Sequence, residues 1–241
     1  MKVSYCSTCK GRMWQLEKTL IANLQKLETI DAEWIIYDYA SPDDFSDLLL
    51  HHPLVKKTIE SGKLKIYKHI LDIPFSMPLA KNLAHHYATG DIVFNLDIDN
   101  FIGDSFEQLT NLQENQFLWA VNTISTAGAM GRIGVSRKVF MELGGYDLNL
   151  EGVGYDDINF AKRLEAHGLK CVVERNVPRP IPNTREDSTK FTDSDLTPND
   201  QYRRSKKVHD RTITRGVKVN PHGSTVYQSL DLTTVTALLT V

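Results

Sequence analysis

The sequence predicts an α/β fold in which helices cover both faces of a mostly parallel central sheet. Short apolar runs alternate with longer amphipathic segments up to about residue 175, which is the pattern of layered α/β proteins. One run, Ile92–Leu96, is continuously apolar, as expected of a strand buried on both faces. The chain has 241 residues, 41% of them hydrophobic, which is enough for one large domain with a substantial core.

Seven short apolar runs predict the strands of this sheet. They are Val3–Ser7, Glu33–Asp38, Leu64–Lys68, Ile92–Asp97, Leu118–Asn122, Ile133–Ser136 and Lys170–Glu174. The clearest helix has its large apolar residues three and four positions apart, so that they share one face: Met13, Leu16, Leu20, Leu24 and Leu27. Three further helices are predicted: one from Ser41 until Pro53 interrupts it, one over Pro78–Ala88 and one over Asp156–His167.

The composition changes near residue 180. Residues 175–200 hold four prolines among Asn, Thr, Ser and Asp, which predicts an extended or mobile loop. Tyr202–Lys218 carries seven Lys and Arg against one Asp, and Ser229–Val241 alternates in a way that could add a strand or dock on the body. We therefore expect a core domain over residues 1–180 and a partly extended, basic C-terminal appendage over residues 181–241.

The overall composition excludes several classes of protein. Lys and Arg number 28 against 30 Asp and Glu, so a wholly basic nucleic-acid binder is disfavoured. No apolar run approaches the roughly 18–20 residues of a membrane-spanning helix, and the start lacks the features of a signal peptide. Three cysteines do not form a disulfide framework, which fits a reducing compartment. We expect a cytoplasmic protein, and peripheral contact with a membrane stays open.

Two carboxylates follow the apolar run of the fourth predicted strand. Asp97 and Asp99 are separated by one residue, and side chains two apart on an extended chain share a face. In open α/β sheets, ligands bind beyond the carboxyl ends of the strands. Carboxylate oxygens suit Mg²⁺ or Mn²⁺, whose remaining ligands are substrate phosphates and water. The alternative is that Asp97, Asp99 and Asn100 only cap a turn. An EF-hand loop is excluded, because its glycine would fall at Ile102.

Other segments surround this acidic motif in a fixed order. They are Ser7–Arg12, Trp34–Ser41, Ala80–Ala84 with Ala88–Asp91, Gly144–Asp147, and Gly152–Asn159 with Arg163-Leu164 beyond. Together with Asp97-Ile98-Asp99 they resemble family 2 glycosyltransferases of the GT-A fold, most of all the branch related to chondroitin polymerases and β-1,4-galactosyltransferases. The resemblance covers about residues 1–175, and it is specific because the elements occur in register.

The resemblance implies a GT-A nucleotide-diphospho-sugar transferase fold, which is Rossmann-like, and a metal-dependent, inverting transfer. The donor would be a nucleotide-diphosphate sugar, with UDP as the expected nucleotide, and the acceptor a hydroxyl of a glycan or other molecule, as in polysaccharide biosynthesis. The residues implied in donor binding are Thr8, Arg12, Asp38, Tyr39, Lys81, Asn82 and Asp97. Those implied as ligands of Mn²⁺ or Mg²⁺ are Asp99 and Asp97, with His209 as a substitute for the metal-binding His of some relatives.

The sequence departs from the family pattern at four points. Tyr39 replaces an acidic residue, so recognition of the base would depend on Asp38, with Tyr39 stacking. Lys81 replaces Arg, which keeps the charge but loses the bidentate fork. Asp156 stands where Glu is usual. The metal-binding His is absent from its place, which leaves His209 or His222 as candidates, or a solvated tail histidine as the alternative.

Asp157 is the candidate general base, and Asp156 would orient an acceptor hydroxyl. Both begin a predicted helix, whose backbone donors and dipole favour an ionised carboxylate. Gly152 and Gly154 before them would let the chain pass close to a substrate. The alternative is that Asp156 and Asp157 are a helix cap, since Asp is among the best capping residues.

Other functions stay open from the sequence. A nucleotide-sugar-binding or lectin-like module without transfer is one, and a nucleotidyltransferase on the same fold is another, although Ser7–Arg12 has only one glycine. Cys6-Ser7-Thr8-Cys9 has the spacing of a thiol oxidoreductase motif. The basic tail could close over the donor diphosphate, be a solvated face, or contact anionic lipid. No nucleic-acid partner is expected, and the oligomeric state cannot be predicted.

Overall fold

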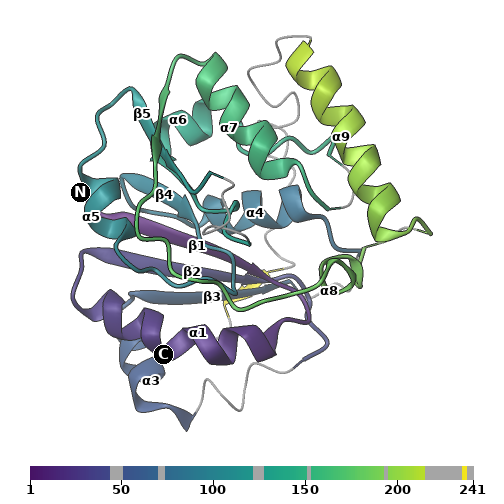
Figure 1. Cartoon of the computed structure of the whole chain (residues 1–241). Coiled ribbons are helices and arrows are strands. Elements are labelled where there is room, and N and C mark those ends of the chain that lie inside the picture. Colours follow the sequence, from purple (N-terminus) through teal and green to yellow (C-terminus); the bar gives the residue numbers. More distant parts are fainter. Residues whose placement is uncertain are drawn as a thin grey trace.

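The computed structural model of the protein describes residues 1–43, 51–69, 74–121, 128–150, 153–192, 195–214 and 235–237. The strands of this part of the chain form one sheet in the order β7-β5-β6-β4-β1-β2-β3-β8 (Figure 1). They are β1 (Val3–Cys9), β2 (Ala32–Asp38), β3 (Leu64–His69), β4 (Ile92–Asn95), β5 (Gln116–Trp119), β6 (Ile133–Ser136), β7 (Lys170–Val173) and β8 (Val235–Ala237). All seven predicted strands are present.

The sheet is mixed and mostly parallel. The central strands β4, β1, β2 and β3 are parallel neighbours, and β5 pairs with β7 in parallel. Strand β6, between β4 and β5, is antiparallel to both, and β8 is antiparallel to β3 at the far edge. The predicted α/β fold with a mostly parallel central sheet is therefore confirmed.

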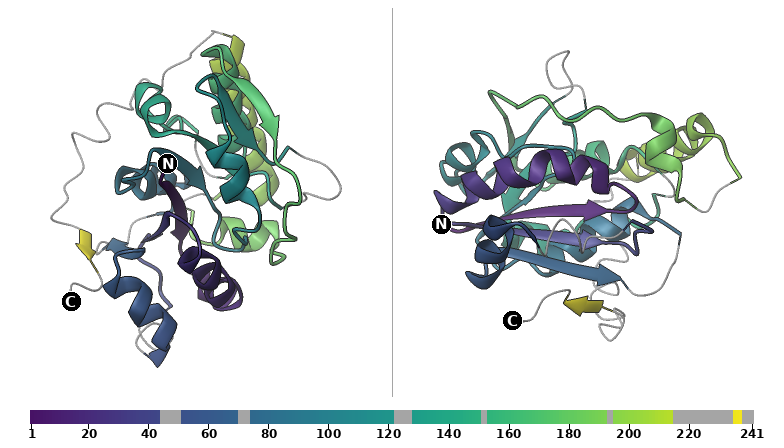
Figure 2. Two further views of the ribbon diagram at one scale, coloured as in Figure 1. Left: turned by 90° about the vertical axis from the view of Figure 1, so that its left-hand side faces the viewer. Right: turned by 90° about the horizontal axis from the view of Figure 1, so that it is seen from below.

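Helices cover both faces of this sheet (Figure 2). They are α1 (Met13–Glu28), α3 (Pro53–Glu60), α4 (Met77–His86), α5 (Ser105–Thr110), α6 (Arg137–Glu142), α7 (Asp156–Ala166), α8 (Arg185–Thr189) and α9 (Pro198–Thr214). Apolar residues of α1, α3 and α5 pack in one core with Tyr5 and Trp34 of the central strands. Residues of α4, α6 and α7 pack in a second core against Cys6 and Tyr37, which point to the opposite face.

The carboxyl ends of β1, β2 and β4 meet at one edge of the sheet. Cys9 pairs with Asp38, and Cys6 pairs with Asn95. Strand β4 is two residues shorter than predicted, because the chain turns there: Asn100 N donates to Asp97 O at 2.8 Å. The two carboxylates of the acidic motif consequently lie on a turn just beyond the strand.

The predicted helix break at Pro53 is present. His51 is helical, His52 is not, and Pro53 begins the new helix α3, where its missing N–H removes nothing from the helical hydrogen bonds. His52 caps this helix, since its ring nitrogen accepts from Leu54 N at 3.2 Å. Residues 44–50, where the helix from Ser41 was predicted, lie outside the described residues.

The predicted appendage contains regular structure that the sequence analysis did not find. The loop expected over residues 175–200 includes α8, and most of the basic run forms α9, which packs against α7. Strand β8 agrees with the prediction that the last residues could add a strand. None of the described helices combines the length and apolar character that crossing a membrane requires.

Candidate active site

A buried lysine links the two acidic motifs. Lys81, on α4, is 2% exposed, and its Nζ lies 2.7 Å from Asp156 Oδ2 and 2.5 Å from Asp157 Oδ1. The same Nζ lies 3.9 Å from Oδ1 of Asp97. The acid that follows β4 and the acids that begin α7 therefore surround one ammonium group. The sequence analysis placed Lys81 at the donor diphosphate, but the structure places it among these carboxylates.

The backbone conformation before α7 orients the side chains of Asp156 and Asp157 toward Lys81. Gly154 and Tyr155 have φ angles of 97° and 65°, so the chain reverses through left-handed conformations immediately before the helix. Tyr202 of α9 lies against Gly154, where an added Cβ would come within 2.4 Å of its ring. The sequence analysis predicted that a substrate would pass close to Gly154, but α9 takes that place through Tyr202. Gly152 lies outside the described residues.

The carboxylate of Asp97 lies in a space that a glycine leaves open. A Cβ on Gly131 would come within 1.9 Å of Asp97 Oδ2, and Asn95 Nδ2 donates to Asp97 Oδ1 at 2.9 Å. Asp99 is 6% exposed, and Asn100 Nδ2 donates to its Oδ1 at 2.8 Å. Each carboxylate is therefore held in place by a neighbouring amide.

Burial and like charges set the protonation of these groups. Desolvation raises the pKa of Asp99 above its usual value, and the charge of Asp97 adds to the effect. Desolvation also raises the pKa of Asp157, and the charge of Asp156 adds to it while Lys81 opposes it. The sequence analysis expected the start of the helix to keep Asp157 ionised; burial opposes that expectation and the contact with Lys81 favours it. Desolvation alone would lower the pKa of Lys81, but the charges of Asp156, Asp157 and Asp97 outweigh it, so the pKa is raised.

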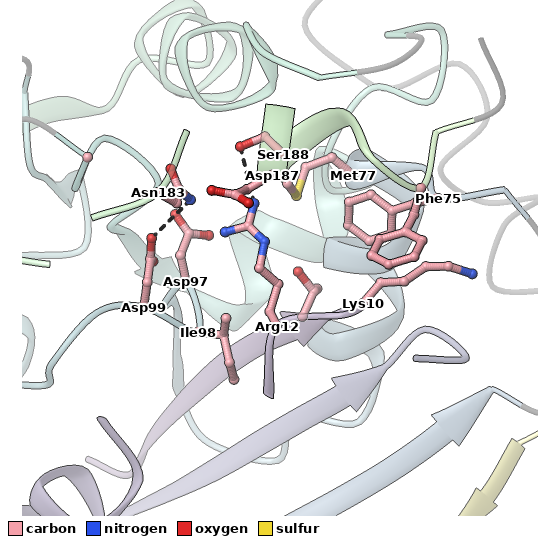
Figure 3. A pocket seen from close by; sticks show the side chains of 13 residues that line it. Lys10, Arg12, Phe75, Met77, Asp97, Ile98, Asp99, Asn183, Asp187 and Ser188 are labelled. Carbon is pink, nitrogen blue, oxygen red and sulfur yellow. Dashed lines mark hydrogen bonds between the residues drawn. The ribbon is translucent and has the colours of Figure 1, made fainter. Parts of the chain in front are cut away.

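A cleft of about 150 Å³ lies beside the acidic motif (Figure 3). It is lined by four residues that the sequence analysis selected, Thr8, Arg12, Asp97 and Asp99. The analysis missed other lining residues, among them Lys10, Phe75, Asn183, Asp187, Ser188 and Phe191. Most of these lie after residue 180, in the segment that was predicted to be an extended loop. Only the polar composition of that segment could have suggested them.

The segment after residue 180 is tied to the residues that precede α1 and α4. Arg12 Nη2 donates to Ser188 Oγ at 3.1 Å, and Phe191 O accepts from Phe75 N at 2.8 Å. Phe191 also covers Gly11, where an added Cβ would meet its ring at 2.1 Å. The predicted appendage therefore forms one wall of the cleft.

Three residues that the sequence analysis assigned to donor binding, Asp38, Tyr39 and Asn82, contact other parts of the protein instead of lining the cleft. The Oδ1 of Asp38 accepts from Ser41 N at 2.8 Å, and Tyr39 is 1% exposed and stacks on His69 with ring centroids 5.3 Å apart. Asn82 is buried and exchanges two hydrogen bonds with the backbone of Tyr146, at 2.8 and 2.9 Å. None of the three lines the cleft beside the acidic motif.

The structure does not bring His209 to the acidic motif. Its ring packs against Tyr155, with centroids 5.3 Å apart, on the side of α7 that faces α9. Within the described ranges, no three His, Cys, Asp or Glu side chains lie together in a way that could hold a metal ion. His209 as a third ligand therefore finds no support in the described residues and stays a prediction, and His222 lies outside them.

Comparison with known proteins finds likeness in structure alone. No family model and no curated protein matches the sequence. Among solved structures, the mannosyltransferase PcManGT from Pyrobaculum calidifontis, in complex with GDP-Man and Mn²⁺, has a TM-score of 0.58 and 14% identity over 94% of this chain and 74% of that one. The catalytic domain of Drosophila β1,4-galactosyltransferase 7, with xylobiose, has a TM-score of 0.54 and 14% identity over 87% and 79%. S. aureus TarS, in complex with UDP-GlcNAc, has a TM-score of 0.54 and 14% identity over 97% of this chain and 78% of that one.

The chain has the GT-A fold. At identities of 12–14% this likeness establishes the architecture and leaves the specific branch undecided. The state of the cysteines opposes the thiol oxidoreductase alternative. Cys6 and Cys9 are 0% and 1% exposed and belong to the cores on opposite faces of the sheet. Burial raises the pKa of Cys9 to about 12, whereas a redox thiol needs access and a low pKa.

A divalent cation fits the acidic motif of this GT-A fold. Asp97 and Asp99 offer hard carboxylate oxygens, which Mg²⁺ and Mn²⁺ prefer. The two acids line the same cleft, and the charge of Asp97 raises the pKa of Asp99. The space beside Gly131 accommodates the carboxylate of Asp97. A bound cation would remove the repulsion that the two acids have without it.

Proposed function

We propose that the protein is a metal-dependent, inverting glycosyltransferase that moves a sugar from a nucleotide-diphosphate sugar to a hydroxyl of a glycan or similar acceptor. The donor nucleotide is UDP in this proposal. The observation that carries it is the position of Lys81, whose ammonium contacts Asp156 and Asp157 and lies 3.9 Å from Asp97. A metal-binding motif and a candidate base thus share one place on a fold that nucleotide-sugar transferases use.

Donor binding is assigned to the cleft beside the acidic motif. Asp97 and Asp99 would hold Mn²⁺ or Mg²⁺, which as a Lewis acid stabilises the charge that grows on the departing diphosphate. Lys10 and Arg12 line the same cleft and would add positive charge to the diphosphate. Thr8, near the end of β1, lines the same cleft. The residues beyond position 180 close the opposite side.

Asp157 is proposed to be the general base. Its carboxylate takes the proton of the acceptor hydroxyl as that oxygen forms a bond to the anomeric carbon, while the bond from that carbon to the diphosphate oxygen breaks. Burial raises the pKa of Asp157 toward the operating pH, where a general base is most effective. The ion pair with Lys81 fixes its position, and Asp156, on the same ammonium, would orient the acceptor.

Donor turnover with Mn²⁺ separates an enzyme from a binding module. A thermal-shift screen of nucleotide sugars, with and without Mn²⁺, identifies the donor, and release of the nucleoside diphosphate then measures turnover. Asp99→Ala is expected to abolish metal-dependent donor binding. Asp157→Asn is expected to keep donor binding and lose transfer by about 10²–10⁴-fold, the contribution typical of a positioned base. Normal turnover by Asp157→Asn would refute the assignment of the base.

The alternative of a nucleotide-sugar-binding module predicts a different result. Such a module would bind the donor in the thermal-shift assay but release no nucleoside diphosphate with any acceptor or with water. Asp157→Asn would then behave as the wild type in every assay. The ion pair of Asp157 with Lys81 favours transfer, because donor binding alone requires no carboxylate held on a buried lysine beside the acidic motif.

A further inference from the structure

We propose that Asn183 is the third protein ligand of the cation, through the oxygen of its side-chain amide. The inference rests on the proposed function, because that function supplies the metal at Asp97 and Asp99. Asn183 lies in the segment beyond the predicted core domain, and neither the acidic motif nor the histidine candidates pointed to it. The amide would complete a site whose first two ligands come from the turn after β4.

The side chain of Asn183 reaches the acidic motif directly. Its Nδ2 lies 3.3 Å from Asp99 Oδ2, and it lines the same cleft as Asp97 and Asp99 (Figure 3). An amide has a donor end and an acceptor end, and rotation about its last bond exchanges them. With a cation between the side chains, the amide would present its oxygen instead of donating a hydrogen bond. Amide oxygens are established ligands of hard divalent cations.

The backbone beside Asn183 is fixed from two directions. Ile181 N donates to Asp99 O at 2.8 Å, which ties the segment to the acidic motif itself. On the other side, Gln15 Nε2 of α1 lies 3.4 Å from Ile181 O and 3.5 Å from Pro182 O. Gln15 is fully buried, and its Oε1 accepts from Arg12 Nη1 at 2.8 Å. The position of Asn183 at the motif is therefore built into the fold.

The same helix also holds the far side of the acidic motif. Thr19 Oγ1 donates to Ile98 O at 2.9 Å, and Asn23 Nδ2 donates to Asn100 O at 3.0 Å. Gln15, Thr19 and Asn23 are four residues apart, so they form one buried polar row along α1. This row binds both the motif and the segment of Asn183, and it fixes their spacing.

The chemistry of the site favours a neutral third ligand. Asp97 and Asp99 already bring two negative charges to the same cleft. In the described part of the chain, no third His, Cys, Asp or Glu joins them. An amide oxygen adds a ligand without a third negative charge, and it leaves positions for diphosphate oxygens and water.

One substitution distinguishes a metal ligand from a hydrogen-bond donor. In Asn183→Asp the side chain keeps its length and an oxygen ligand but loses the N–H donor. If Asn183 only donates to Asp99, both variants remove that donor but leave the two carboxylate ligands in place, so Asn183→Ala keeps the wild-type Mn²⁺ affinity. If Asn183 is a ligand, Asn183→Asp retains Mn²⁺ affinity, whereas Asn183→Ala loses it. Asn183 is exposed, so neither variant threatens the core.

The experiment is a titration of the full chain with Mn²⁺ in the presence of UDP, followed by the electron paramagnetic resonance signal of free Mn²⁺. We expect Asn183→Ala to weaken Mn²⁺ binding by about 10-fold or more, since even outer-shell partners of metal ligands contribute 10–100-fold. Asn183→Asp should bind Mn²⁺ at least as tightly as the wild type. Asn111→Ala, which removes another exposed amide that does not line the cleft, is the matched control and should bind as the wild type does.

Each result decides between the inference and its alternatives. Wild-type affinity in Asn183→Ala, or equal weakening in Asn183→Ala and Asn183→Asp, would overturn the inference while the wild-type titration still supports a metal-dependent transferase. A spin-echo spectrum with nitrogen bonded directly to Mn²⁺ would also overturn it, because it would assign the position to a histidine. Failure of the wild type to bind Mn²⁺ would instead refute the metal in the proposed function, and the inference with it.

Discussion

Gly131 and Asp97 approach so closely that a single methyl group would not fit between them. A Cβ on Gly131 would come within 1.9 Å of Asp97 Oδ2. The backbone just before β6 thus forms the wall against which the first acid of the motif rests. This contact joins the sequence-distant β6 side of the sheet to the proposed metal site.

Gly131→Ala is expected to displace Asp97 and weaken Mn²⁺-dependent donor binding. The added methyl group overlaps the carboxylate, and overpacking of this kind costs about 1–3 kcal/mol of stability. Gly62→Ala is the control, because φ at Gly62 is 72° but nothing lies within 4 Å of the added Cβ. A thermal-shift assay with donor should therefore show loss of stabilisation in Gly131→Ala alone. Full donor stabilisation in Gly131→Ala would contradict the placement of Asp97 in the metal site.

Lys81→Met is expected to destabilise the folded protein strongly. The ammonium is buried among Asp156, Asp157 and Asp97, and removing one partner of a buried ion pair typically costs about 3–5 kcal/mol. The loss should be largest at alkaline pH, where the carboxylates are ionised, and should decrease as acid protonates them. Urea unfolding at several pH values measures it. A loss that is independent of pH would show that packing, and not charge, explains the effect.

The pH dependence of transfer should report the environment of Asp157. A general base acts in its deprotonated form, so a raised pKa moves the acidic limb of kcat/KM upward from the ordinary range near pH 4. We expect activity to increase with pH through the neutral range. Asp156→Asn removes a like charge that raises the pKa of Asp157, so the limb of that variant should shift to lower pH. An unchanged limb in this variant would count against Asp157 as the titrating group.

Glu33 should dominate the loss of stability in acid. Desolvation raises its pKa, but hydrogen bonds from Lys65, Ser4 and Lys2 outweigh this and lower the pKa to about 2. A carboxyl with a lowered folded-state pKa stabilises the protein above the unfolded pKa of about 4.5, and this contribution is lost as pH falls toward 2. Glu33→Gln should be less stable than the wild type at pH 7, and its stability should change less between pH 5 and 2. Parallel pH curves for the two proteins would refute this assignment.

The sequence predicted the sheet because its signal is local. Ile92–Leu96 and the other apolar runs carry their strand pattern in a few consecutive residues, and Asp97 and Asp99 follow from the end of one strand. Helix α1 was found for the same reason. Its row of Gln15, Thr19 and Asn23 was not, because buried polar residues on an apolar helix give no pattern until their backbone partners are known.

The parts of the structure that the sequence did not predict depend on contacts between segments far apart along the chain. Helix α9 buries Gln201, Ser205 and Thr212 and exposes charged residues, so it has no apolar stripe for periodicity to detect. Asn183 reaches Asp99 across 84 positions, a distance along the chain that no motif spans. Lys81 was selected for its charge, but its partners could be identified only once α4 and α7 had been placed together.

Strand β8 has a consequence for how the protein behaves in concentrated solution. Val235–Ala237 pairs with Tyr67, Lys68 and His69, and it thereby occupies the backbone groups on the outer side of β3. An unpaired outer strand is a template on which identical molecules can add their own strands. A chain shortened before Val235 would carry an open ladder along β3, and oligomers or fibrils joined through that strand are the expected result.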